Sequence, residues 1–169
     1  MKKALAMLFL LVGCVKAPHG VSPVKEFKLD RYLGKWYEIA RLDHSFERGL
    51  AKVSATYSMR DDGGVKVINK GYLEAESRWK EAEGRAYFVK SPDVGFLKVS
   101  FFGPFYGSYV VIDLDKENYN YSLVCGPSRD YLWILSRTTT ISDGVKARLI
   151  DKAKAAGFPT EKLIWVEQE

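Results

Sequence analysis

The sequence predicts an all-β protein, an eight-stranded antiparallel up-and-down barrel with one C-terminal α-helix packed outside it and a short final strand. Three observations support this architecture. From Gly34 onward, short segments alternate between apolar and polar residues, as strands with one buried face do. Turn sequences separate the segments at regular intervals. A single helical pattern follows the last segment.

The candidate strands are rich in Tyr, Val, Phe and Thr, which strands prefer. They cover Trp36–Asp43, Val53–Arg60, Val65–Leu73, Ala82–Lys90, Phe96–Phe102, Ser108–Leu114, Asn120–Cys125 and Tyr131–Arg137. Asp61-Asp62-Gly63-Gly64 is a strong hairpin signal, because Asp and Gly adopt the positive φ angles that tight turns need. Residues 91–93, 115–118 and 126–128 contain further turn signals.

The C-terminal helix is predicted to begin at Ser142-Asp143, a good N-cap pair. Val145, Leu149, Ala153 and Ala156 then fall on one face, so the helix is expected to lie against the outside of the barrel. Gly157 and Pro159 end it. Residues 163–166 are apolar and predict the short final strand.

Alternation also assigns the faces of the strands, because successive side chains point to opposite sides. Lys66, Lys70, Arg85, Lys98 and Ser100 mark the outer face. The predicted ligand-lining residues on the inner face are Ala55, Tyr57, Val67, Asn69, Ala86, Phe88, Leu97, Val99, Phe101, Ser108, Val110, Tyr131 and Trp133. Met59, Gly71, Ala82, Gly84, Ile112 and Leu135 share that face. Many of these residues are small, which leaves room for one elongated apolar ligand. The alternative is a core filled by its own side chains.

The N-terminus predicts export. Met1-Lys2-Lys3 is followed by an apolar run too short to cross a bilayer, as in a secretory signal. Leu11-Val12-Gly13-Cys14 resembles the bacterial lipobox, in which the chain is cut before the Cys and the Cys is acylated. We therefore expect a signal peptide at 1–13, an acylated tether at 14–25 and a folded domain at 26–169. An ordinary signal peptide with an incidental Cys is the alternative.

The charge distribution and the cysteine content argue against nucleic-acid binding, a disulfide framework and a metal site. The formal net charge of +5 is spread along the chain, without the basic run that suits nucleic acid. If Cys14 carries lipid, Cys125 is alone and no disulfide framework exists. No His and Cys spacing predicts a metal or haem site. Val15, in place of Asp, favours the outer membrane, an inference that depends only on the resemblance to bacterial lipoproteins.

Two motifs carry a family resemblance. Gly34-Lys35-Trp36-Tyr37, on the first strand, and Leu135-Ser136-Arg137-Thr138, on the last, resemble the signature motifs of the lipocalin family. Together with the lipobox, they make the chain similar to the bacterial outer-membrane lipoproteins of that family, in its apolipoprotein-D-like branch. In an up-and-down barrel these two motifs meet at one end, so Trp36 and Arg137 are expected to plug the base as a cation–π pair.

The same topology predicts the rim of the open end. Loops 44–52, 74–81, 103–107 and 126–130 form it, and cations there suit a ligand with an anionic head. The rim cations are His44, Arg48, Lys52, Arg78, Lys80 and Arg129. Each has the ordinary alternative of a solvated loop charge. Phe102, Phe105 and Tyr106 are expected to contact a membrane or a partner, or to pack the loop.

The resemblance implies non-catalytic binding, storage or transport of fatty acids, lysophospholipids or phospholipids. It implies a protein anchored to the outer membrane by N-terminal acyl chains, with its domain in the periplasm, no cofactor and no metal. It also allows a homodimer. Sequestration of a drug or pigment, a lipid-modifying enzyme and a purely structural lipoprotein are the alternatives. Cys125 is out of phase with the inward Ser122 and Val124, and no imidazole is expected near it, which disfavours a thiol enzyme.

Overall fold

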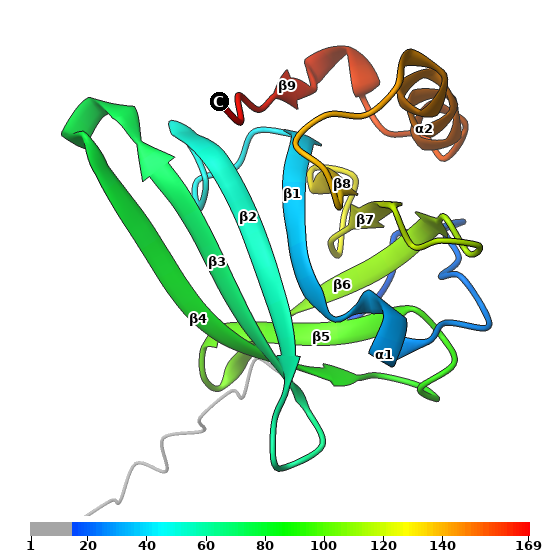
Figure 1. The fold of residues 1–169 in the computed structure, drawn as a ribbon. Coiled ribbons are helices and arrows are strands. Elements are labelled where there is room, and N and C mark those ends of the chain that lie inside the picture. Colours follow the sequence, from blue (N-terminus) through cyan, green and yellow to red (C-terminus); the bar gives the residue numbers. More distant parts are fainter. Residues whose placement is uncertain (1–14) are drawn as a thin grey trace, which may run out of the picture.

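Strand β1 (Gly34–Arg41) hydrogen-bonds to β2 (Leu50–Met59) on one side and to β8 (Leu132–Ser136) on the other. This double pairing closes an antiparallel barrel in the computed structural model, which describes residues 15–169 (Figure 1). Between them, each strand pairs with the next one in the chain: β3 (Val65–Leu73), β4 (Arg78–Phe88), β5 (Phe96–Phe102), β6 (Phe105–Leu114) and β7 (Tyr121–Cys125). The predicted barrel is confirmed.

The strand boundaries differ from the predictions mainly at one end of the barrel. β4 begins at Arg78 and not at Ala82, while β6 begins at Phe105 and not at Ser108. The added residues of β4 are exposed on both faces, so they carry no apolar alternation. Backbone pairing with β3 continues over these residues although neither of their faces is buried, and such pairing leaves no apolar pattern in the sequence.

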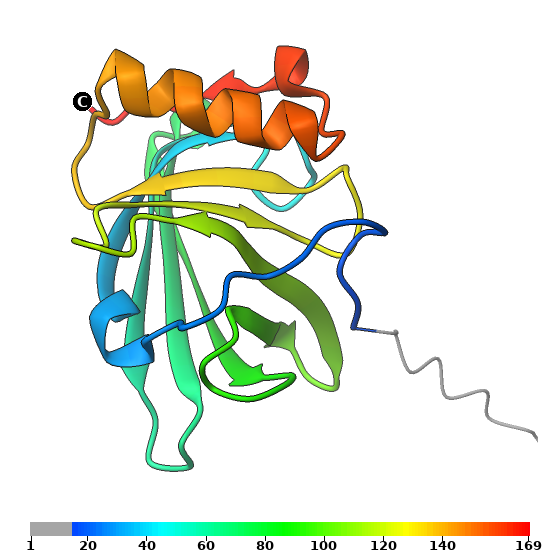
Figure 2. The same ribbon diagram turned by 90° about the vertical axis from the view of Figure 1, so that its right-hand side faces the viewer.

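Helices α1 (Leu29–Tyr32) and α2 (Asp143–Ala155) flank the barrel, with short 3₁₀ turns η1 (Glu74–Glu76) and η2 (Thr160–Lys162). As predicted, Ser142 caps α2 by accepting a hydrogen bond from the Val145 amide. Leu149 and Ala153 are buried, so α2 lies on the barrel's outer surface (Figure 2). β9 (Ile164–Trp165) pairs with β1. The short α1 was not predicted. Within residues 15–169, no helix is long and apolar enough to cross a bilayer.

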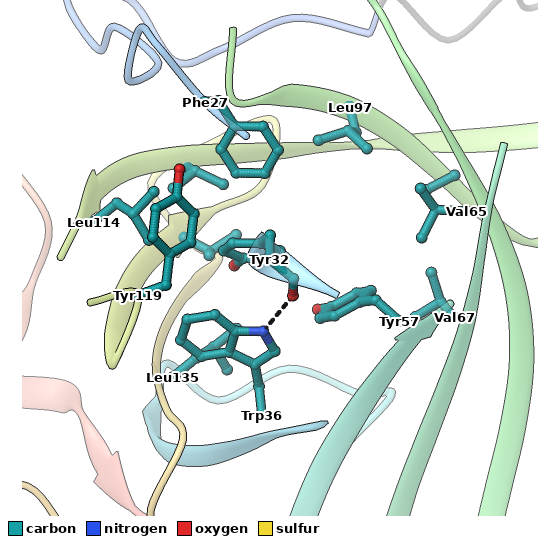
Figure 3. Packing of buried hydrophobic residues seen from close by; sticks show 13 residues of the cluster. Phe27, Tyr32, Trp36, Tyr57, Val65, Val67, Leu97, Leu114, Tyr119 and Leu135 are labelled. Atoms are coloured by element: carbon teal, nitrogen blue, oxygen red, sulfur yellow. Dashed lines mark hydrogen bonds between the residues drawn. The ribbon is translucent and has the colours of Figure 1, made fainter. Parts of the chain in front are cut away.

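Where α2 and the N-terminal segment cover it, the barrel wall is apolar on both sides, so the molecule has two cores. The inner core gathers inside the barrel around Trp36 and Tyr57 (Figure 3). The outer core lies between the wall and α2, and it includes Leu132, Ile134 and Cys125. Burial on both faces removes the alternation that normally separates inside from outside.

The phase of β6 was predicted wrongly for this reason. Leu97, which is in the inner core, pairs with Tyr109, and Lys98 pairs with Ser108. Tyr109 and Val111 therefore point inward. Ser108 points outward, and Val110 and Ile112 belong to the outer core. Ser108 and Val110 are consequently not ligand-lining residues.

The predicted tether lies on the outer face of this same strand. Val24 donates its amide to the Val111 carbonyl at 2.8 Å, and the Lys16 carbonyl accepts from Ser108 Oγ at 2.7 Å. Pro18 is buried. Residues 15–25 thus cover an apolar part of the wall. Cys14 and the predicted signal peptide lie outside the described residues.

The end of the barrel that carries α1 is closed, and we call it the base. Trp36 is fully buried there, and its indole N–H donates to the Tyr32 carbonyl at 2.8 Å (Figure 3). The Arg137 guanidinium lies 3.9 Å from the centre of the Trp36 ring. It also donates to the carbonyls of Lys35, Arg31 and Tyr119, so it ties three chain segments together. We call the opposite end, formed by residues 43–49, 74–77, 103–104 and 126–131, the mouth.

Replacing Trp36 tests this packing. We expect Trp36→Ala to lower the free energy of unfolding by about 3–5 kcal/mol, because it removes a fully buried indole and the partner of the Arg137 cation. The matched Trp165→Ala removes an indole that is 41% exposed and should cost about 1 kcal/mol or less. Urea unfolding followed by circular dichroism compares them. Equal losses for the two variants would contradict the role of Trp36 at the base.

Candidate functional site

The barrel interior is lined by apolar side chains that remain partly open to solvent. Val99, Phe101 and Trp133 pack against the inner core, yet each is only partly buried. Near the mouth the inner face of β4 is open, since Ala82 shares the inward phase of the buried Ala86 and is itself exposed. The inner wall therefore presents apolar side chains that solvent can reach near the mouth.

Some small inward residues make room for neighbouring side chains and not for a ligand. A Cβ added to Gly84 would lie 2.8 Å from the Phe101 ring, and one added to Gly71 would lie 3.0 Å from Leu50. Those two glycines therefore accommodate the barrel's own residues. Ala55 and Asn69, which pair across β2 and β3, remain partly exposed on the inner face.

A tyrosine network forms the floor of the interior. Tyr109 Oη lies 2.8 Å from both Tyr32 Oη and Tyr57 Oη, and Tyr32 Oη also lies 3.1 Å from Ser122 Oγ. Burial raises the pKa of Tyr32 to about 12, so its hydroxyl stays protonated and able to donate. The network satisfies the polar atoms at the floor while leaving the rings as apolar surface.

A bulge in β1 places two charged residues in the same interior. The register with β8 shifts between Glu38 and Ala40, so both Glu38 and Arg41 pair with residues of the inner face. Arg41 Nη1 donates to Glu38 Oε1 at 2.8 Å, and Arg41 Nη2 donates to the carbonyls of Glu47 and Leu50. Both side chains are buried. Arg41 Nε makes no hydrogen bond among the described residues, which leaves a buried donor in this group.

The loop that follows β1 completes this polar cluster, which comprises Glu38, Arg41, His44, Glu47 and Trp133. Glu47 Oε2 accepts from Trp133 Nε1 at 2.9 Å. His44 Nε2 lies 2.8 Å from the same oxygen, an ion-pair distance, although its N–H direction does not meet hydrogen-bond geometry. Trp133 thus presents a ring to the interior while its N–H holds the mouth loop.

The two carboxyl groups of the cluster titrate in opposite directions. Burial, with the neighbouring Glu47 charge, raises the pKa of Glu38 well above its ordinary range, despite the Arg41 guanidinium. The pKa of Glu47 is lowered: burial acts to raise it, but the close contact with the His44 imidazole and the hydrogen bond from Trp133 more than offset that effect. The two shifts therefore favour the neutral form of Glu38 and the ionised form of Glu47.

Most of the predicted rim cations are engaged with neighbours. Arg48 pairs with Asp43 at 2.9 Å, and Arg78 with Glu76. His44 is buried in the polar cluster, and Arg129 donates to the carbonyls of Ala156 and His19. Arg48 and Arg78 are thus charge-balanced, and the Arg129 guanidinium is occupied by backbone carbonyls. This weakens the expectation that rim cations hold an anionic head group. Arg41, in contrast, has a buried Nε donor without a hydrogen-bond partner among the described residues.

Cys125 lies outside the barrel, in the outer core. Its pKa is raised to about 12 by burial, so the thiol is neutral and not nucleophilic. The expectation that it is out of phase with the interior is confirmed by its place in that core. Cys125 therefore does not line the barrel interior, where a thiol acting on a bound ligand would have to lie.

Sequence reasoning placed eleven of its thirteen lining residues where the structure has an inward or mouth position. They are Ala55, Tyr57, Val67, Asn69, Ala86, Phe88, Leu97, Val99, Phe101, Tyr131 and Trp133. It missed Tyr109, Tyr32, Arg41 and Glu47. Tyr109 is hidden by a strand that is buried on both faces, and Arg41 by a bulge that no residue pattern marks.

Comparison with known proteins agrees with this geometry. A family model described as a lipocalin-like domain matches residues 27–168. A Vibrio cholerae protein named outer membrane lipoprotein Blc is 58% identical over 160 residues, which cover 95% of this chain and 94% of that protein. Its namesake in Escherichia coli K12 is 60% identical, with 95% and 91% covered. Bovine apolipoprotein D is 34% identical, with 90% and 82% covered. The solved structure of insecticyanin from Manduca sexta superposes with a TM-score of 0.69 at 22% identity, covering 90% of this chain and 86% of that one.

The polar cluster predicts a pH dependence of stability. Folding raises the pKa of Glu38, so the stabilisation it reflects is fully present below the ordinary glutamate pKa of about 4.3 and is lost as pH rises through the raised value. Glu38→Gln keeps the side-chain shape but cannot ionise. We expect its free energy of unfolding, measured in urea at a series of pH values, to fall less than that of the native protein as the pH rises above the ordinary glutamate pKa. Parallel profiles would show that Glu38 does not titrate abnormally.

Proposed function

This chain belongs to the lipocalin family, and from that premise we propose that it binds and carries lipids with an acyl tail at the bacterial outer membrane without transforming them. The ligand class is fatty acids, lysophospholipids or phospholipids. The observation that carries the proposal is the open apolar inner wall of a barrel that is sealed at its base. The close relatives named outer membrane lipoproteins support the location.

Transfer of the acyl chain from water supplies the affinity. Each buried CH₂ group contributes about 0.8 kcal/mol, so a long chain binds well in a preformed cup without any strong polar contact. Phe88, Val99 and Phe101 offer rings and methyl groups to such a chain. Because Trp36 and Arg137 close the base, the tail enters through the mouth and its polar head stays there.

The polar cluster suits an acidic head group. Arg41 is the cluster's cation, and its Nε donor is buried without a hydrogen-bond partner among the described residues. A carboxylate or phosphate oxygen accepts such a charge-assisted hydrogen bond. Cys14 is the proposed anchor, since acylation there holds the cup at the membrane and raises its local concentration. A thiol enzyme is not favoured, because Cys125 lies in the outer core.

Obstruction of the interior tests lipid binding. Ala82→Trp adds an indole on the inner face of β4, in the path to the cup, and we expect it to raise the Kd for a fluorescent fatty acid about tenfold or more. Glu83→Trp adds the same indole to the outer face of the same strand and should leave the Kd unchanged. Circular dichroism checks that both variants fold. Equal affinities in the two variants would place the ligand outside the barrel.

Loss of the anchor tests the proposed location. We expect Cys14→Ser, exported behind an ordinary cleavable secretory signal in place of residues 1–13, to move from the membrane fraction to the soluble fraction while fatty-acid binding is retained, because the acyl chains hold the protein at the membrane. Cys125→Ser is the matched control and should stay in the membrane fraction, since that thiol is buried. Fractionation with quantitative immunoblotting measures both. Membrane association that survives Cys14→Ser in full would contradict the anchor.

A further inference from the structure

Exposed aromatic side chains gather on the mouth of the barrel. Phe102 and Phe105, which pair across the tip of the β5–β6 hairpin, are 75% and 71% exposed. Phe46 in the β1–β2 loop is 74% exposed, and Trp79 beside the β3–β4 turn is 50% exposed. Large rings left in water at three places around the mouth suit an apolar or interfacial partner.

The N-terminal segment runs to that same end. Lys25 and Val24 pair with residues 94 and 111 toward the base, whereas the Lys16 carbonyl is bound by Ser108 near the start of β6. Figure 2 shows residues 15–28 (dark blue) crossing the outside of the barrel from α1 to the opposite side. The segment is therefore a strap that leads from the base to the mouth.

Side-chain contacts hold the strap in place. Arg129, in the mouth loop between β7 and β8, donates to the His19 carbonyl at 2.8 Å and to the Ala156 carbonyl at the end of α2. Val15, Ala17 and Val21 pack against the outer core. Only Val15 lies between Cys14 and Lys16 in the chain, and two consecutive Cα spacings allow at most about 8 Å between their Cα atoms.

We infer that the mouth of the barrel faces the membrane, with the β5–β6 hairpin resting in the lipid interface beside the acylated Cys14. This inference depends on the proposed anchor. The occupant of the aromatic surface is the bilayer itself, because the strap delivers the anchor to the edge where the exposed rings lie. Aromatic rings are the side chains that favour the interface between headgroups and acyl chains.

This orientation gives the strap a function. A free tether would let the barrel tumble at the end of its anchor, whereas the strapped segment fixes which end meets the lipid. A lipid then passes between bilayer and cup without its tail crossing water, which would remove the cost of exposing that tail. The base, closed by Trp36, faces the aqueous side.

The test measures the depth of two matched positions in the full acylated chain, reconstituted into vesicles of phosphatidylethanolamine and phosphatidylglycerol. Phe105→Cys and Met59→Cys each replace an exposed apolar residue, at the mouth and at the base respectively. Each carries a nitroxide label, and Cys125 is too buried to compete for it. Collision rates with oxygen, which enters lipid, and with a water-soluble nickel chelate are compared by electron paramagnetic resonance.

We expect the ratio of oxygen to nickel collisions to be several-fold higher at position 105 than at position 59. Adding Phe102→Ser to the position-105 variant should lower that ratio toward the value at position 59. Val89→Ser, a matched change of an exposed residue at the base, should leave it unaltered. Equal ratios at positions 105 and 59, or a higher ratio at position 59, would overturn the orientation.

Separate measurements on the same preparation distinguish the two proposals. Mass spectrometry before reconstitution reports acylation of Cys14 and bound fatty acid. Retained fatty-acid binding with equal label ratios overturns the orientation alone. Lost binding with the expected ratios overturns the lipid-carrier function alone, and absence of the acyl group overturns the anchor and the orientation together.

Discussion

The contact between Trp36, Tyr32 and Arg137 at the base determines which end of the barrel is closed and which is open. The buried indole is held by the Tyr32 carbonyl on one side and covered by the Arg137 guanidinium on the other. Because Arg137 also binds three backbone carbonyls from separate segments, the first strand, the last strand and α1 meet at one point. A barrel sealed in this way has one open end, so the polar cluster, the exposed rings and the proposed path of ligand entry all belong to the mouth.

Burial on both faces of the wall is the second constraint. The outer surface of β6 to β8 is too apolar to face water, and α2 and residues 15–25 cover it. The covering segment is therefore part of the fold as well as a connection to the anchor. It links the two proposals, since the same contacts that bury the wall also hold Lys16 and His19 near the mouth, a few positions after the proposed anchor in the chain.

Much of the fold could be predicted from sequence, because the strands, the Asp61–Gly64 turn and the Ser142 cap are local signals. The inward and outward faces of β2 to β5 could also be predicted, since lysines and arginines mark the outer face of these strands. The inward face of β6 could not be predicted, because both faces of the strand are buried and Ser108 and Val110 look no different from inward residues. Arg41 was missed because a bulge changes the phase within β1, and the strap was missed because its contacts are mainly to backbone atoms.

The interior combines an apolar wall with a compact polar cluster near its open end. The proposed function requires that the ligand binds to this wall. The most direct measurement is an NMR experiment on protein with ¹³C-labelled methyl groups, titrated with oleic acid. We predict intermolecular nuclear Overhauser effects from the oleate methylenes to the methyl groups of Val99, Val67 and Leu97, which face the interior. Effects confined to Val110, Ile112 and other methyls of the outer core would contradict the account.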